Sequence, residues 1–146
     1  GNEEQKLRFL PPACSGEKIG GICMSEPHVG TDVLGMRSMA VPSADGSSFT
    51  LNGTKMWISN GTLDGKTTGD LFLLYAKTNP SAKYGGLTSF VVEKGMPGFT
   101  VGQKINDKCG MRSSPTAELV FENVVIPKAN VIGDVGGAVL CMMRNL

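Results

Sequence analysis

Leu71-Phe72-Leu73-Leu74-Tyr75-Ala76 is a short apolar run between polar residues, a pattern typical of a buried β-strand. A second run, Thr88-Ser89-Phe90-Val91-Val92, has the same character. Outward from this pair, shorter apolar or alternating runs indicate further strands at 22–24, 36–41, 48–51, 55–58, 117–121, 124–126 and 130–132. Short strands at this spacing, with 20 glycines to supply turns, predict a mainly β fold of the barrel or sandwich kind.

The expected turns lie between these runs. Residues 43–46 (Ser-Ala-Asp-Gly) and 95–99, which include Pro97 and Gly98, have turn composition. Asn52-Gly53 predicts a tight hairpin. Residues 61–69 and 79–86 are polar and are expected to form loops.

Both ends of the chain have helical patterns. Asn2 can cap a short helix that runs to Leu10 and ends at Pro11-Pro12. Residues 136–146 place apolar side chains at helical spacing without a stop signal. We therefore expect a C-terminal helix that is truncated at Leu146, in a chain that is a fragment of a longer protein.

Composition argues against several classes of protein. Fourteen basic and 13 acidic residues give a net charge of +1, so no basic stripe for nucleic acid is expected. No apolar run approaches the roughly 20 residues of a membrane span. Four scattered cysteines and a single histidine, His28, lack the spacing of a metal site, and they fit free thiols in a reducing compartment.

Residues 22–32 contain the first candidate binding segment. Ser25-Glu26-Pro27 at a strand exit has a simple interpretation as a strand cap and turn. However, Gly30-Thr31-Asp32 follows closely, and glycine with free amides and a hydroxyl can bind phosphate oxygens. Neither a Gly-x-Gly-x-x-Gly nor a P-loop motif is present, so a Rossmann or ATPase function has no support.

The second candidate segment holds the only tryptophan, Trp57. A buried tryptophan most often anchors a core. Ser59 follows at the same-face spacing of a strand, so a ring and a hydroxyl could together hold a flat aromatic cofactor. His28 fits a solvated turn residue, and Arg112 fits a surface or domain-interface charge. One histidine supports no catalytic triad.

At these residues the chain resembles the acyl-CoA dehydrogenase family, over essentially its whole length. Within the family, 93–99 and the start at 1–6 are most similar to isovaleryl-CoA dehydrogenases. Five motifs stand in the order found in the family: Met24-Ser25-Glu26-Pro27-x-x-Gly30-Thr31-Asp32, Leu51-Asn52-Gly53-x-Lys55-x-Trp57-Ile58-Ser59-Asn60-Gly61, Phe90-Val91-Val92-Glu93-Lys94-Gly95-Met96-Pro97-Gly98-Phe99, Gly110-Met111-Arg112-x-Ser114 and Glu118-Leu119-x-Phe121-Glu122-x-Val124-x-Ile126-Pro127.

The resemblance implies a domain organisation and a set of binding residues. Residues 1–20 would end an N-terminal helical domain, 21–133 would form the β-domain, and 134–146 would begin a C-terminal helical domain. FAD would be the cofactor and an acyl-CoA the substrate. The implied FAD-binding residues are Ile22, Cys23, Met24, Ser25, Gly30, Thr31, Trp57, Ile58 and Ser59, and the implied acyl-CoA contacts are Thr31, Lys83 and Tyr84.

The resemblance also implies a reaction and its partners. A carboxylate removes the α-proton of a short branched acyl-CoA thioester, such as the isovaleryl-CoA of leucine degradation, while a β-hydride passes to flavin N5. No residue of this chain is assigned as the base, so we expect the chain alone to be inactive, and to bind FAD weakly or not at all. Electron-transfer flavoprotein would accept the electrons, and the full-length protein would be a homotetramer of the mitochondrial matrix.

Two departures from the family pattern and two alternatives accompany this interpretation. The loop 62–69 is longer than usual, and His28 replaces a small or amide residue. An acyl-CoA oxidase shares the β-domain but passes electrons to oxygen. A non-catalytic binding or assembly module could use the same barrel, although it would not need the hydroxyls and tryptophan of the site.

Overall fold

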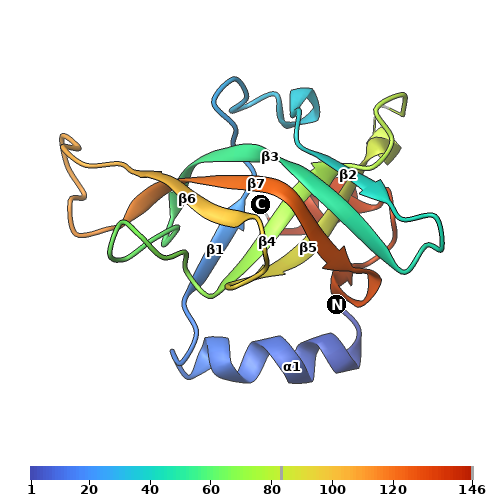
Figure 1. Cartoon of the computed structure of the whole chain (residues 1–146), viewed down its shortest axis with the longest axis horizontal. Helices are drawn as coiled ribbons and strands as arrows, with labels where there is room; N and C mark the ends of the chain where they lie inside the picture. Colours follow the sequence, from blue (N-terminus) through green and yellow to red (C-terminus); the bar gives the residue numbers. More distant parts are fainter. Residues whose placement is uncertain (83, 146) are drawn as a thin grey trace.

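Within residues 1–82 and 84–145, which the computed structural model describes, eight strands form one sheet in the order β6-β7-β3-β2-β4-β5-β8, with β1 paired in parallel to β4. A helix lies at each end of the chain, so the predicted mainly β fold is confirmed (Figure 1). The strands are β1 (Gly20–Cys23), β2 (Met39–Pro42), β3 (Ser48–Ser59), β4 (Leu71–Lys77), β5 (Leu87–Glu93), β6 (Phe99–Lys104), β7 (Thr116–Pro127) and β8 (Val131–Ile132). The helices are α1 (Glu3–Cys14) and α2 (Ala138–Asn145), with 3₁₀ turns at Val33–Gly35, Tyr84–Gly86 and Lys128–Asn130.

The sheet curls over its own apolar face, which encloses the main core. Phe72 on β4 meets Phe99 on β6 edge to face, with ring centroids 5.7 Å apart, although these strands are distant in the sheet order. Phe99 also stacks on Phe121 of β7, and Phe49 of β3 contacts Phe90 of β5. In Figure 1, β3 and β7 accordingly cross in front of β4 and β5. Two layers thus arise from one sheet.

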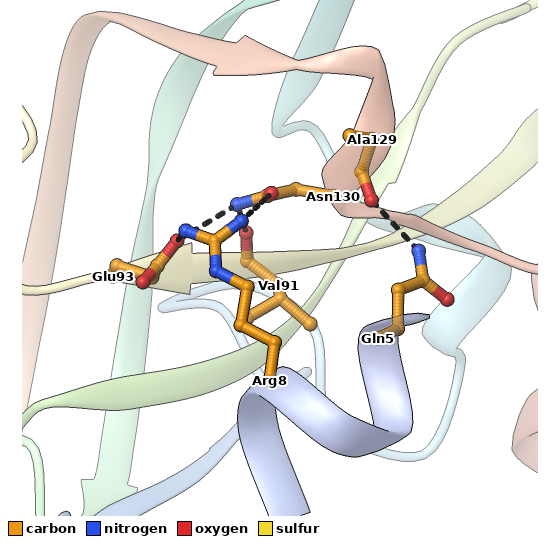
Figure 2. A network of polar contacts seen from close by, with 6 residues as sticks. All are labelled: Gln5, Arg8, Val91, Glu93, Ala129 and Asn130. Atoms are coloured by element: carbon orange, nitrogen blue, oxygen red, sulfur yellow. Dashed lines mark hydrogen bonds and ion pairs between the residues drawn. The ribbon is translucent and has the colours of Figure 1, made fainter. Parts of the chain in front are cut away.

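Helix α1 docks on the sheet through polar contacts (Figure 2). The Gln5 side-chain amide donates to the carbonyl of Ala129 at 2.8 Å, and Gln5 is buried. Arg8 forms an ion pair with Glu93 at 2.6 Å, and Asn130 donates to the same carboxylate at 3.3 Å. The helix is therefore fixed to β5 and to the segment after β7.

Helix α2 covers a second, smaller core. Ala138 and Met142 are buried in it against Met36, Tyr75 and Leu87. Within the described part of the chain, no helix is long and apolar enough to span a membrane.

Helix α1 is longer than the sequence predicted. Asn2 caps it as expected, since its side chain accepts from the Gln5 amide at 2.8 Å. The predicted end at Leu10 is wrong, because Pro11 and Pro12 lie inside the last turn. Each proline removes one backbone donor. This loss is tolerable near an exposed helix end, where carbonyls commonly bond to water.

The predicted hairpin at Asn52-Gly53 is also wrong, because β3 runs straight through it. The Asn52 side chain bonds across the sheet to Asn123, donating to its side-chain oxygen at 3.2 Å and accepting from its amide at 2.8 Å. Gly53 has φ +152°, and an ideal Cβ there would lie 2.3 Å from the hydroxyl oxygen of Ser38. Glycine is thus needed for close packing rather than for a turn. The hairpin turn lies at the predicted 43–46, and β6 was not predicted.

We expect Gly53→Ala to lower the free energy of unfolding by about 2 kcal/mol, because it adds both backbone strain and a clash with Ser38. Urea denaturation at pH 7 measures this loss. Gly85→Ala is the control, since its added methyl group would meet open space. Equal stability of the two variants would show that Gly53 is not constrained.

Candidate functional site

The two segments singled out in the sequence lie side by side. The Met56 amide donates to the carbonyl of Ser25 at 2.9 Å, and the Asn60 side chain donates to the carbonyl of Gly20 at 3.0 Å. Gly21 packs so closely on β3 that a Cβ would lie 2.4 Å from the Ser59 carbonyl oxygen. Strand β1 and the segment that follows it are therefore bonded to the end of β3.

A β-bulge in β3 turns Trp57 outward. Lys55 pairs with Leu119 and Ile58 pairs with Ala117, so β3 has one more residue than β7 over this interval. Trp57 itself has φ +59°, a left-handed conformation that is uncommon for a bulky residue. Lys55 and Ile58 are both buried, whereas Trp57 is 56% exposed. Without the extra residue, strand alternation would direct Trp57 to the same side as Lys55.

The outward side chains form a surface that suits a planar ring. We call Ile22, Ser25, Trp57 and Ser59 the Trp57 surface. Ile22 is 53% exposed and Trp57 is 56% exposed, so both give apolar area for stacking. Among the described residues, the hydroxyls of Ser25 and Ser59 have no hydrogen-bond partner in the protein, so they are available to a ligand. Strained backbone of this kind concentrates at functional sites.

The loop between β6 and β7 forms a wall beside this surface. Trp57 and Ser59 line a shallow depression of about 510 Å³ together with Lys108, Met111 and Thr116. The Lys108 ammonium donates to the Thr116 hydroxyl at 2.9 Å and thereby ties the loop to β7. Met111 has φ +50° and is 80% exposed. In the sequence, this loop was marked only by the family motif at 110–114, and nothing indicated a role for Lys108.

Other predicted binding residues have different settings. Cys23 and Ile58 are buried in the core, so only their backbone can reach a ligand. Met24 is half-buried against the smaller core. Gly30 and Thr31 are exposed beyond the turn, away from the hydrogen bonds that join β1 to β3.

Two of the predicted acyl-CoA contacts, Thr31 and Tyr84, lie near a second depression. Tyr84 is 69% exposed and lines a hollow of about 280 Å³ with Asp32 and Lys77. Thr31 directly precedes Asp32 in the chain. Because Asp32 and Tyr84 line the same hollow, the segment of Thr31 approaches the segment of Tyr84. Lys83 lies outside the described residues. His28 is exposed in the turn after Glu26, as predicted for a solvated residue.

A buried ion pair that sequence reasoning missed lies behind the Trp57 surface. The Lys55 ammonium contacts the Glu26 carboxylate at 2.9 Å, and the two side chains are 0% and 4% exposed. The carboxylate also accepts from the backbone amides of Arg37 at 2.6 Å and Ser38 at 3.0 Å. Burial lowers the pKa of Lys55, with Glu26 opposing this effect. Burial raises the pKa of Glu26, but the Lys55 charge and the accepted hydrogen bonds outweigh it, so that pKa lies below its ordinary value of 4.5.

We expect the Glu26–Lys55 pair to make stability depend on acidity. Because the folded-state pKa of Glu26 is lowered, its contribution is present above about pH 4.5 and is lost as pH falls through the folded-state value. Urea denaturation between pH 7 and pH 3.5 should therefore give a steeper loss for the wild type than for Glu26→Gln/Lys55→Met. Parallel pH profiles of stability for the two proteins would show that the ion pair does not cause the pH dependence.

Among the described residues, no cluster of His, Cys, Asp and Glu could hold a metal ion.

Comparison with known proteins places these features in a family. The sequence profile described as "Acyl-CoA dehydrogenase, middle domain" matches residues 21–124. A mitochondrial isovaleryl-CoA dehydrogenase of Solanum tuberosum is 46% identical over the whole chain, which corresponds to 34% of that relative. A mitochondrial 2-methylacyl-CoA dehydrogenase of the same organism is 44% identical over the same extent. The chain thus spans about a third of the length of the curated relatives it matches.

Solved structures agree with the sequence comparison. Butyryl-CoA dehydrogenase from Megasphaera elsdenii superposes with a TM-score of 0.90 at 40% identity, covering 99% of this chain and 36% of that one. An acyl-CoA dehydrogenase from Bacillus anthracis, solved in complex with FAD, gives a TM-score of 0.84 at 34% identity, covering 97% of this chain and 23% of that one. This chain therefore belongs to the acyl-CoA dehydrogenase family, and its residues 21–124 match the middle domain of that family.

Proposed function

We propose that the chain is the FAD- and acyl-CoA-binding β-domain of a dehydrogenase that acts on a short branched acyl-CoA, with isovaleryl-CoA as the substrate. Domain limits of 21–133, with helical flanks at 1–20 and 134–146, accompany this proposal. The observation that carries it is the Trp57 surface, where two hydrogen-bonded segments supply an exposed ring on a strained bulge and two free hydroxyls. The isovaleryl-CoA dehydrogenase relative supports the choice of substrate.

The residues of the Trp57 surface would bind and orient the flavin. Trp57 would lie against the isoalloxazine ring, and Ser25 would donate to its pyrimidine edge. When bound, FAD supplies the acceptor for the hydride from the substrate β-carbon. Ser59 would lie near the N5 and O4 edge, where its hydroxyl stabilises developing negative charge. The backbone of 22–24 and 58, together with Gly30 and Thr31, completes the proposed contacts.

Substrate contacts and proton transfer complete the proposal. Thr31, Lys83 and Tyr84 would hold the CoA arm near the hollow that Tyr84 and Asp32 line. No carboxylate of this chain is assigned as the α-proton base, so the chain alone should not dehydrogenate acyl-CoA. Turnover of isovaleryl-CoA by the purified chain with an electron acceptor would refute this point.

The full protein would have the partners that the family implies. Electron-transfer flavoprotein would accept the electrons, the assembly would be a homotetramer, and the location would be the mitochondrial matrix. The mitochondrial name of the potato relative supports that location.

A flavin titration tests the function. We expect added FAD to quench the fluorescence of Trp57 with a weak but saturable dependence on FAD concentration, because the single tryptophan is on the proposed surface. A Trp57→Ala variant, followed through flavin absorbance, should lose affinity about tenfold. Leu63→Ala is the control, because Leu63 is equally exposed on a separate loop. Equal affinity of both variants would favour a non-catalytic module.

A further inference from the structure

The Glu26–Lys55 pair has no part in the proposed contacts with flavin, yet it lies directly behind them. We infer that Lys55 and Glu26 are positioning residues, which fix where Ser25 lies relative to Trp57 on the Trp57 surface. This inference rests on the proposed function for its flavin readout, and it has a separate readout in Trp57 itself.

The first step of the argument is that the pair joins three segments. Glu26 belongs to the turn after β1, and its carboxylate accepts from the amides of Arg37 and Ser38 at the entrance to β2. The Lys55 ammonium reaches that carboxylate from β3 at 2.9 Å. Three parts of the chain thus converge on two side chains, away from water.

The second step is that Lys55 makes contacts close to Ser25 and also lies close to Trp57 in β3. Besides the carboxylate, the Lys55 ammonium donates to the carbonyl of Met24 at 3.2 Å, one residue before Ser25. The following residue, Met56, donates its amide to the carbonyl of Ser25 at 2.9 Å. Lys55 is also the last paired residue before the bulge that turns Trp57 outward. The position of Ser25 relative to Trp57 therefore depends on the contacts of Lys55 and of the adjacent Met56.

The third step concerns why charged groups are used here. An apolar pair of similar volume could fill the same space at little or no cost in stability, so stability alone does not explain a buried ion pair. A charged ammonium has directional donors, and both the Glu26 carboxylate and the Met24 carbonyl use them. Such bonds specify one register of the turn on β3, whereas apolar contacts would tolerate several.

The experiment uses Glu26→Gln/Lys55→Met, which removes both charges and leaves no unpaired buried ion. Arg8→Met is the matched control, because it removes the Arg8–Glu93 ion pair at α1. Ile126→Ala is the control for lost stability, as it truncates the core at the far end of β3 and β7. Circular dichroism establishes that each variant is folded at the working temperature.

We expect the double variant alone to show faster local motion of Trp57, seen as lower fluorescence anisotropy. Its FAD affinity should fall about tenfold, as expected if the binding arrangement is populated in one molecule in ten. Both controls should keep the wild-type anisotropy. A folded double variant with unchanged anisotropy and unchanged FAD affinity would overturn the inference.

The two readouts separate this inference from the proposed function. If the wild type fails to respond to FAD, the proposed function fails, and Trp57 anisotropy alone decides the positioning role. If the double variant does not fold, Glu26→Gln replaces it. Glutamine keeps one acceptor oxygen in place of two, so this variant loses the ion pair with Lys55 and one of the hydrogen bonds from the Arg37 and Ser38 amides. Wild-type anisotropy and affinity in folded Glu26→Gln would then count against the inference.

Discussion

Lys55→Met is expected to lower the free energy of unfolding by about 3–5 kcal/mol at pH 7, because it leaves a buried carboxylate without its counter-charge. Glu26 is 4% exposed and would keep only the amides of Arg37 and Ser38 as partners. The loss is a large part of the roughly 5–15 kcal/mol that stabilises an ordinary domain. Urea denaturation followed by circular dichroism measures it.

The double variant gives this prediction its control. Glu26→Gln/Lys55→Met removes both charges, so it should be more stable than Lys55→Met alone. The deficit of Lys55→Met should also shrink as the pH falls, because burial without the Lys55 charge raises the pKa of Glu26 and a protonated carboxyl group needs no counter-charge. If Lys55→Met proved as stable as the wild type, the buried ion pair would not exist in the folded chain.

Phe121→Ala is expected to cost about 3–5 kcal/mol, as large truncations in a packed core do. Phe121 is 1% exposed and stacks on Phe99 with ring centroids 4.8 Å apart. Phe99 in turn meets Phe72, so the truncation opens a cavity at the point where the curled sheet closes on itself. Thermal and urea denaturation should agree on the loss.

Val125→Ala provides the control from the same strand. Val125 lies on β7 but is 57% exposed, so its truncation should change stability by no more than about 0.5 kcal/mol. Similar losses for the two variants would contradict the assignment of inner and outer faces on β7.

Much of the fold could be predicted because its strands follow simple periodicity. The apolar runs at 71–76 and 88–92 became β4 and β5, which are central to the core. Sequence rules failed where tertiary contacts overrode a local signal. Asn52-Gly53 has hairpin composition, yet both residues lie within one long strand. There Asn52 forms hydrogen bonds with Asn123, and Gly53 packs closely against Ser38. Strand β6 has a glycine at its centre, Gly102, which weakens the pattern.

The site was predictable only in part, for a related reason. The segments of Ser25 and Trp57 were singled out from their residue types, the family motifs gave these residues their roles, and the structure brings the two segments together. The bulge that exposes Trp57 has no local signature, because it exists only in the pairing of β3 with β7. Lys55 was overlooked since a lysine in a strand is ordinarily solvated. Its partner lies 29 positions away in the chain, and only folding brings the charges together.

An NMR titration of the ¹⁵N-labelled chain with FAD tests the central claim most directly, because it also detects weak binding. The single indole N–H signal of Trp57 and the amides of Ser25 and Ser59 should shift in proportion to bound FAD. The amides of the 43–46 turn, at the opposite end of β3, should not move. If millimolar FAD left the Trp57 indole unmoved, or shifted a different face of the sheet, the proposed flavin surface would be wrong.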